Sequence, residues 1–187
     1  LRNIPNMIVS APMNETELRN LMYTAQLPGN GPFSIRYPRG NGVIVEWKNE
    51  FEEIPVGKGR QISEGKDIVV LSIGHPGNFV VEAAKVLKNE GISIAHYDMR
   101  FVSPLDKNIL NEVAERFNKV ITIEDGIIEG GFGSAVIEYF STIGKKPKIR
   151  RLGIPKRFVE HGSQAELQRE CGFDTDGICK AVREMMC

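Results

Sequence analysis

The chain has 187 residues, with 24 Lys and Arg against 24 Asp and Glu, so its formal net charge at pH 7 is zero. A balanced charge provides no general attraction to nucleic acid or to an anionic membrane. No apolar run approaches the roughly 18 residues of a membrane span, and the first residues lack the basic-then-apolar pattern of a signal peptide. We therefore expect a cytoplasmic protein with neither a nucleic-acid nor a membrane partner. Its length predicts one domain and part of another, at about 100 to 200 residues per domain.

The three cysteines, Cys171, Cys179 and Cys187, are odd in number and lie near the end of the chain. They show neither CxxC spacing nor interleaved histidines. A disulfide framework or a zinc site would need a different count and spacing. We therefore expect reduced thiols, as in a cytosolic protein.

The chain does not begin with Met and opens inside a connecting segment, so we expect it to be a piece of a longer polypeptide. Residues 7–10 predict a short buried strand. A helix should follow, because Asn14 can cap it, Glu17 lies three residues on as in a capping box, and apolar residues then repeat at helical spacing. A second strand is expected at 33–36. One helix and two strands are too little to close a core, so residues 1–42 should complete a sheet begun upstream.

Residues 43–55 mix apolar and acidic side chains without a period, which is typical of an interdomain linker. Strands and helices then alternate over residues 56–187, beginning with an edge strand in 56–63. This alternation implies an α/β fold in three layers, a mainly parallel sheet with helices on both faces. Ser103 should cap one helix and Pro104 should occupy its first position. The expected strands are 67–73, 92–98, 119–123 and 148–154, and the expected helices are 78–90, 104–117, 133–143, 163–171 and 175–186.

The most informative stretch is NGPFSIRYPRGNG at residues 30–42. A short apolar run leads Arg36 and Arg39 into a turn rich in proline and glycine. Such strand ends carry binding groups in α/β proteins, because the scaffold is rigid and the backbone can approach a ligand. Guanidinium groups match phosphate or carboxylate in a bidentate manner. The stretch predicts an anion clamp, with solvated or acid-paired arginines as the equally weighted alternative.

Two histidines and a glycine-rich turn are further candidates. His75 follows a strand, at the edge of a parallel sheet where ligands bind, so it either acts on an anion or a proton or is an ordinary loop residue. His161 precedes a helix cap, where a structural role is favoured over contact with a neighbouring domain. The turn Gly-Gly-Phe-Gly at 130–133 precedes a helix whose N–H groups could hold a phosphate. Its spacing fits neither a dinucleotide motif nor a Lys-containing phosphate loop, so packing against a neighbouring domain or subunit is favoured.

Glu124 and Asp125 are adjacent carboxylates at a strand end. Paired acids can divide acid and base roles when their environments differ. Neighbours on an extended backbone point in opposite directions, however. A capping or subunit-contact role is therefore favoured over a cooperating dyad.

Several separated motifs together resemble one enzyme family. The stretch IRYPRG at 35–40 is followed by DMRFVSPLD at 98–106 and by EDGIIEGGFGS at 124–134. In this order they resemble the C-terminal portion of the 1-deoxy-D-xylulose-5-phosphate synthases, which are transketolase-like thiamine-diphosphate enzymes. The resemblance implies that residues 1–42 end a pyrimidine-binding domain and that residues 56–187 form a transketolase C-terminal-like domain.

The resemblance also implies a reaction. Pyruvate loses carbon dioxide, and the remaining two-carbon unit joins D-glyceraldehyde 3-phosphate to give 1-deoxy-D-xylulose 5-phosphate, a precursor of isoprenoids, thiamine and pyridoxal. Thiamine diphosphate, bound with Mg²⁺, supplies the electron sink. By position, Arg36 matches the family arginine that holds the acceptor's phosphate, Arg39 lies beside it, and Tyr37 is interpreted as a packing residue.

In this family the cofactor motifs and catalytic histidines belong to upstream segments. We therefore expect no catalytic, cofactor-binding or metal-binding residue here, and the chain alone should neither turn over substrate nor bind thiamine diphosphate tightly. The full-length enzyme is expected to be a homodimer. Two alternatives remain open. One is the C-terminal part of a transketolase or of a 2-oxo acid dehydrogenase β subunit, and the other is a non-catalytic module for dimerisation or regulation.

Overall fold

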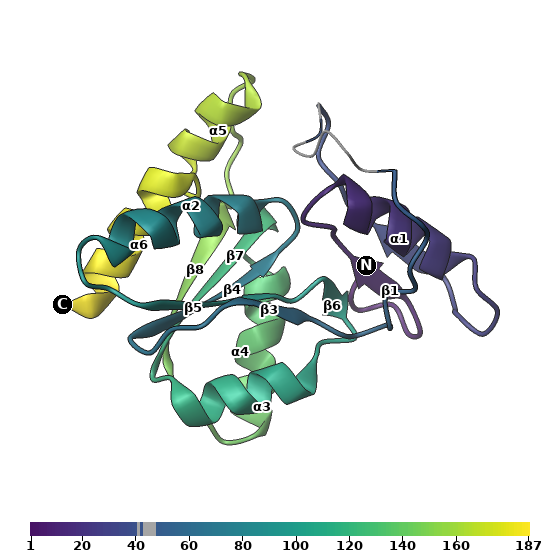
Figure 1. The fold of residues 1–187 in the computed structure, drawn as a ribbon, viewed down its shortest axis with the longest axis horizontal. Coiled ribbons are helices and arrows are strands. Elements are labelled where there is room, and N and C mark those ends of the chain that lie inside the picture. The colour runs from purple at the N-terminus through teal and green to yellow at the C-terminus, as the bar shows by residue number, and fades with distance from the viewer. Residues whose placement is uncertain (41, 43–47) are drawn as a thin grey trace.

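A computed structural model describes residues 1–40, 42 and 48–187 of the chain (Figure 1). A large sheet with helices on both faces forms most of it, and residues 1–40, called the N-terminal segment below, lie at one end of that sheet. The elements in chain order are β1 (Ile8–Ser10), α1 (Glu15–Ala25), β2 (Phe33–Ile35), β3 (Arg60–Ser63), β4 (Ile68–Ile73), α2 (Pro76–Lys88), β5 (Ile94–Asp98), β6 (Phe101–Ser103), α3 (Lys107–Arg116), β7 (Lys119–Ile127), α4 (Phe132–Thr142), β8 (Lys148–Ile154), α5 (Gln164–Glu170) and α6 (Thr175–Met186).

The large sheet has five strands in the order β3-β5-β4-β7-β8. Its strands are parallel apart from the edge strand β3, which pairs antiparallel with β5. The central strand β4 is buried along its whole length, as expected for a parallel strand covered on both faces. The predicted α/β fold is therefore confirmed, and β3 occupies the last part of the edge strand expected within 56–63.

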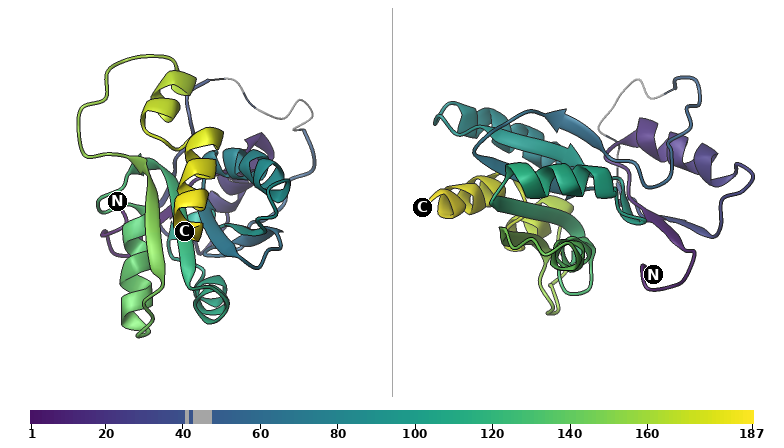
Figure 2. Two further views of the ribbon diagram at one scale, coloured as in Figure 1. Left: turned by 90° about the vertical axis from the view of Figure 1, so that its left-hand side faces the viewer. Right: turned by 90° about the horizontal axis from the view of Figure 1, so that it is seen from below.

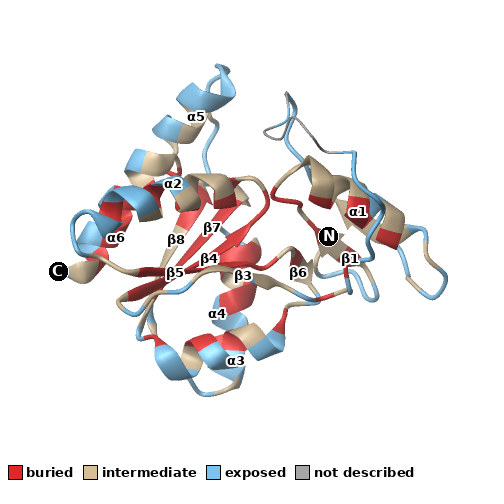
Figure 3. Ribbon diagram, in the orientation of Figure 1, coloured by how far each residue is buried: buried red, intermediate tan, exposed pale blue. Residues whose placement is uncertain are grey.

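Alternate side chains of β4 enter two separate cores, because successive residues of a strand point to opposite faces. Ile68 and Val70 pack with helices α2 and α6, whereas Val69 and Leu71 pack with α3 and α4. Figure 1 shows these two pairs of helices on opposite sides of the sheet, and Figure 3 shows the buried strands between them. Burial of one such side chain contributes about 1.5 to 3 kcal/mol, so the two cores stabilise this part of the chain.

Helix α3 begins later than predicted. Ser103 is the last residue of β6, and its peptide bond to Pro104 is cis. Asp106 is the N-cap instead, because its carboxylate accepts hydrogen bonds from the backbone N–H groups of the first turn at 3.0 and 3.3 Å. The prediction of a Ser103 cap with Pro104 at the first helical position is therefore wrong. The reason is that strand pairing holds Ser103.

The N-terminal segment joins the rest of the chain through β6, a strand that the sequence analysis missed. The predicted strand β1 pairs antiparallel with β6 on one side and parallel with β2 on the other. Three residues are too few to show the alternation that identifies a strand. The outer edge of β2 has no partner strand among the described residues, and its pairing with an upstream sheet remains a prediction.

A small third core forms between the N-terminal segment and later residues. Ile8 and Leu21 are buried against Ile54 and Phe101. The backbone N–H of Ile54 also donates to the hydroxyl of Thr24 at 2.9 Å. The expectation that the segment cannot close a core by itself therefore agrees with the structure. Residues 48–55 of the predicted linker are described and contact α1, whereas residues 43–47 lie outside the described part.

Helix α1 is capped by Asn14, as predicted, since its side chain accepts the backbone N–H of Glu17 at 3.0 Å. The expected capping box is not formed, because the Glu17 carboxylate turns elsewhere. One oxygen, Oε2, accepts the N–H of Met13, and the other, Oε1, lies 2.8 Å from both Arg60 and Arg100. Glu17 is only 4% exposed. A buried carboxylate of the N-terminal segment thus pairs with two arginines beyond it.

Asp98 completes this charge cluster. It is fully buried at the end of β5, and its Oδ2 lies 3.4 Å from Nε of Arg60. Burial, and next the negative charge of Glu17, raise the pKa of Asp98 to about 8. Arg60 and Arg100 act in the opposite direction. The boundary between α1 and the large sheet therefore holds a cluster of two buried acids and two partly buried arginines.

The two ends of the chain lie far apart, with the N-terminus beside β1 and the C-terminus after α6 (Figure 2). All three cysteines are free thiols. Burial raises the pKa of the Cys171 and Cys179 thiols. Among the described residues, no helix has the length and apolar character needed to cross a membrane.

We predict that Glu17→Gln lowers the free energy of unfolding of the chain by about 2 to 4 kcal/mol, because it removes the charge of a buried carboxylate that pairs with two arginines. Urea unfolding measures this loss. Glu82→Gln is the matched control, since Glu82 pairs with Lys85 at an exposed position and its loss should cost less than about 1 kcal/mol. Equal losses in the two variants would contradict a stabilising role for the cluster.

Candidate functional site

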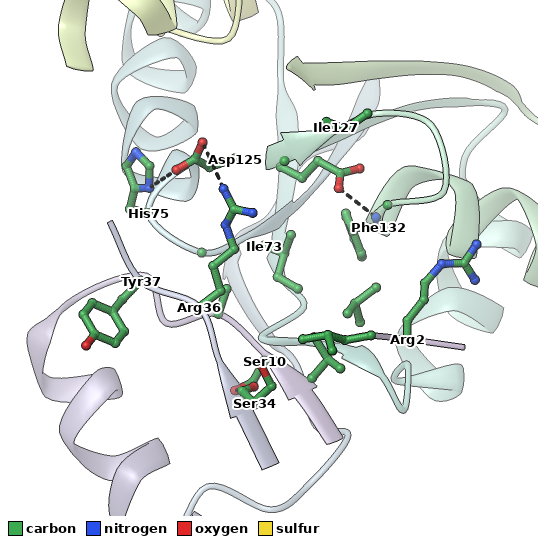
Figure 4. A pocket seen from close by; sticks show the side chains of 18 of the residues that line it. Arg2, Ser10, Ser34, Arg36, Tyr37, Ile73, His75, Asp125, Ile127 and Phe132 are labelled. Atoms are coloured by element: carbon green, nitrogen blue, oxygen red, sulfur yellow. Dashed lines mark hydrogen bonds and ion pairs between the residues drawn. The ribbon is translucent and has the colours of Figure 1, made fainter. Parts of the chain in front are cut away.

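A cavity of about 330 Å³ lies between the N-terminal segment and the carboxyl ends of β4 and β7 (Figure 4). Ser10 and Arg36 line it from one side, and His75 and Asp125 line it from the other. Ligands of parallel sheets bind at this edge of the strands. The cavity is therefore the candidate functional site.

Strand pairing places Arg36 at this cavity. Its backbone N–H donates to the carbonyl of Ser10 at 2.8 Å, directly after the end of β2. Nη2 of its side chain lies 3.7 Å from Oδ1 of Asp125, and the side chain remains 60% exposed. A separation of 3.7 Å is an ion pair without a direct hydrogen bond. Arg36 thus presents a partly paired guanidinium to the cavity, as Figure 4 shows.

His75 lies on the other side of Asp125, with its Nδ1 3.7 Å from Oδ2 of the carboxylate. Its second ring nitrogen, Nε2, lies 3.0 Å from the side-chain nitrogen of Gln168 in α5. Burial lowers the pKa of His75, although the charge of Asp125 opposes this shift. The ring is therefore neutral at pH 7. Since Gln168 presents an N–H donor to Nε2, the proton of the neutral ring lies on Nδ1 and faces Asp125.

Glu124 points away from Asp125 and caps helix α4. Its two oxygens accept hydrogen bonds from the backbone N–H groups of Phe132 and Gly133 at 2.8 and 2.9 Å. Burial raises the pKa of Glu124, and these hydrogen bonds oppose the shift. The preference for a capping role over a carboxylate dyad is therefore confirmed for Glu124.

The Gly-Gly-Phe-Gly turn at 130–133 does not offer a phosphate site in this structure, because Glu124 already occupies N–H groups at the start of α4. The carbonyl of Gly130 instead accepts a hydrogen bond from Nε of Arg2 at 2.7 Å. The turn thus packs against a residue of the N-terminal segment. This agrees with the packing role that the sequence analysis favoured.

Of the other predicted residues, Arg39 and His161 lie outside the cavity lining, whereas Tyr37 belongs to it. The side chain of Arg39 is exposed and does not line it, and its backbone carbonyl accepts a hydrogen bond from Gln164. His161 is also exposed and outside the cavity lining. Tyr37 lines the cavity and is 54% exposed, so its interpretation as a packing residue is wrong within the described residues. Ligand-binding roles for Arg36, Arg39, His75 and His161 remain predictions.

Sequence reasoning missed the contact of Asp125 with Arg36 and that of Gln168 with His75. Each contact joins residues about 90 positions apart, and neither follows from local periodicity. The one available signal is the position of Asp125 at the end of a buried strand. Residues at that edge of a sheet face whatever packs against the strand ends.

Residues 57–178 match the family described as "Transketolase, C-terminal domain", and the chain belongs to this family. It is similar to the 1-deoxy-D-xylulose-5-phosphate synthases of Cytophaga hutchinsonii, 59% identical over 185 residues, and of Bacteroides thetaiotaomicron, 55% identical over 183 residues. These alignments cover 98% and 97% of this chain but only 29% and 28% of the relatives. The chain therefore spans less than a third of their length. The resemblance to the C-terminal portion of these synthases is confirmed.

A solved structure agrees with this assignment. It is described as "Split gene transketolase, inactive beta4 tetramer" and is 30% identical, with a TM-score of 0.83. The match covers 99% of this chain and 59% of that chain. The N-terminal segment is thus part of the shared architecture.

We predict that Gly131→Ala destabilises the chain, because the added methyl group would lie 2.0 Å from Oε2 of Glu124 and 2.6 Å from the carbonyl of Ile127. Displacing the cap of α4 should lower the free energy of unfolding by about 2 kcal/mol or more. Gly162→Ala is the control, since its methyl group meets only ordinary contacts at 3.4 Å and beyond, and should change stability by less than about 0.5 kcal/mol. Similar denaturation midpoints for the two variants would show that the cap tolerates displacement.

Proposed function

We propose that the chain is the C-terminal part of a thiamine-diphosphate-dependent transferase that converts pyruvate and D-glyceraldehyde 3-phosphate into 1-deoxy-D-xylulose 5-phosphate and carbon dioxide. The printed names of its relatives support this proposal. The observation that carries it is the position of Arg36, whose exposed guanidinium lines the cavity at the sheet's carboxyl edge. In this proposal Arg36 holds the phosphate of the acceptor.

The chemistry of Arg36 suits a phosphate. A guanidinium carries five N–H donors in a plane. The ion pair with Asp125 at 3.7 Å engages none of them in a direct hydrogen bond. They therefore stay free for phosphate oxygens, and one charge-assisted hydrogen bond to such an oxygen contributes about 1.5 to 3 kcal/mol.

The described residues do not fit thiamine diphosphate or Mg²⁺. They contain no group of three His, Cys, Asp or Glu side chains that could hold a metal ion. A helix N-terminus is a common binding place for a diphosphate. The N–H groups at the start of α4 donate to Glu124 instead. We therefore derive no step through the cofactor and propose that cofactor, metal and pyruvate are held by other parts of a longer protein.

We further propose that this longer protein is a cytoplasmic homodimer and that residues 1–42, 43–55 and 56–187 are its pyrimidine-domain end, linker and C-terminal domain. The chain alone is proposed to be inactive. Two observations support this: it spans 29% of a relative's length, and a similar solved chain is described as an inactive tetramer. That same neighbour makes a transketolase the second candidate, and formation of product from pyruvate distinguishes the two.

We predict that Arg36→Ala, in an enzyme spanning the full length of the relatives, raises the KM for D-glyceraldehyde 3-phosphate about 10- to 100-fold, the equivalent of one lost charge-assisted hydrogen bond. The KM for pyruvate should stay within about twofold, since the phosphate belongs to the acceptor alone. Steady-state kinetics with each substrate varied in turn measures both constants.

Two controls accompany this measurement. Arg183→Ala should change the acceptor KM less than about threefold, because Arg183 pairs with Glu90 at an exposed position and does not line the cavity. The 187-residue chain, assayed with both substrates, thiamine diphosphate and Mg²⁺, should form no product. An unchanged acceptor KM in Arg36→Ala would indicate a structural role for Arg36. The proposed function would then be reduced to that of an unspecified member of the broader thiamine-dependent family.

A further inference from the structure

Four side chains form a row that leads from α5 to the cavity, and the last three of them line it. Gln168 of α5 contacts Nε2 of His75 at 3.0 Å, and Nδ1 of His75 faces Oδ2 of Asp125 at 3.7 Å. The other oxygen of Asp125 faces Arg36, also at 3.7 Å. The row begins on the short helix α5 and ends on the N-terminal segment. Figure 4 shows His75 and Arg36 on the two sides of the Asp125 carboxylate.

We propose that Asp125 is a positioning residue that orients Arg36 toward the acceptor's phosphate, and that His75, held by Gln168, confines the Asp125 carboxylate on its other side by packing and by the dipole of its Nδ1–H group. This inference rests on the proposed function of Arg36. It assigns a role in substrate recognition to residues of the transketolase C-terminal domain, which the proposal above did not give to that domain.

The side chains become more exposed along the row from His75 to Arg36, as a positioning role requires. The side chain of His75 is 16% exposed and that of Asp125 is 28% exposed, whereas that of Arg36 is 60% exposed. His75 also contacts Phe79 edge-on, with ring centroids 5.7 Å apart. The held end of the row is therefore packed, and the free end faces the cavity.

The spacing of the ion pair leaves the N–H donors of Arg36 available to a ligand. A carboxylate at hydrogen-bond distance would occupy the guanidinium in a bidentate manner and compete with a phosphate. At 3.7 Å the carboxylate still attracts the guanidinium, but it takes none of its N–H donors. An arginine that is already oriented loses less side-chain freedom when it binds, and for one such side chain the effect on affinity is about three- to tenfold.

A purely electrostatic role for Asp125 predicts the opposite sign. The negative charge of Asp125 repels a phosphate, so removing that charge should strengthen acceptor binding if charge is all that Asp125 supplies. If Asp125 positions Arg36, removing the ion pair should weaken acceptor binding. The direction of the change in KM therefore separates the two roles.

The test uses Asp125→Asn in the full-length enzyme, because asparagine keeps the size of the side chain and removes its charge. We expect the KM for D-glyceraldehyde 3-phosphate to rise about three- to tenfold, with the KM for pyruvate within about twofold. With D-glyceraldehyde, which lacks the phosphate, the same variant should match the wild type. Asp125→Glu keeps the charge and should recover most of the loss. An unchanged or lowered KM for the phosphorylated acceptor would overturn the proposal, and so would an equal loss with D-glyceraldehyde.

The double variant links the effect to Arg36. Combined with Arg36→Ala, the Asp125→Asn change should raise the acceptor KM no further, because the residue that it positions is absent. If Arg36→Ala alone leaves the acceptor KM unchanged, the proposed function fails. If Arg36→Ala raises it but Asp125→Asn does not, only the positioning role fails.

If Asp125→Asn does not fold, a second variant tests the positioning role. His75→Phe keeps a ring against Phe79 and removes the N–H that faces Asp125. We expect a rise of about two- to threefold in the acceptor KM, in the same direction as for Asp125→Asn. A His75→Phe enzyme with wild-type acceptor kinetics would overturn the proposed role of His75 and Asp125.

Discussion

The pairing of β1 with β6, together with the Glu17 carboxylate between Arg60 and Arg100, holds the N-terminal segment against the large sheet. The candidate site depends on this contact. β2 is joined to β6 through β1, and Arg36 is held to β1 by its backbone hydrogen bond. A shift of β1 would therefore move Arg36 away from the strand ends. The site is thus a property of the boundary between the two parts of the chain.

The two adjacent acids at the end of β7 have different roles in this arrangement. Glu124 binds the first N–H groups of α4 and so stabilises the helix that covers one face of the sheet. By doing so it also removes that helix terminus as an anion site. Asp125 points to the opposite side, toward Arg36 and His75. In the proposed function, phosphate recognition is then assigned to Arg36, and residues at the strand ends of the sheet are proposed to orient it.

The sequence predicts the main architecture well, because hydrophobic alternation and helix caps are local properties. Every strand of the large sheet and every helix was expected close to its observed position. The failures involve distant partners. Strand β6 exists because β1 is available to pair with it, and Glu17 leaves its capping box because two arginines from elsewhere in the chain lie within reach. The same holds for the site, where the position of Arg36 was predicted but its contact with Asp125 was not.

The most direct measurement is a crystal structure of the full-length enzyme with D-glyceraldehyde 3-phosphate bound. We expect phosphate oxygens about 2.7 to 2.9 Å from the guanidinium nitrogens of Arg36, the range of charge-assisted hydrogen bonds. The Asp125 carboxylate should face the same guanidinium from the side that the phosphate leaves free. A phosphate bound elsewhere, with Arg36 directed away from it, would contradict the claim that this boundary forms the acceptor site.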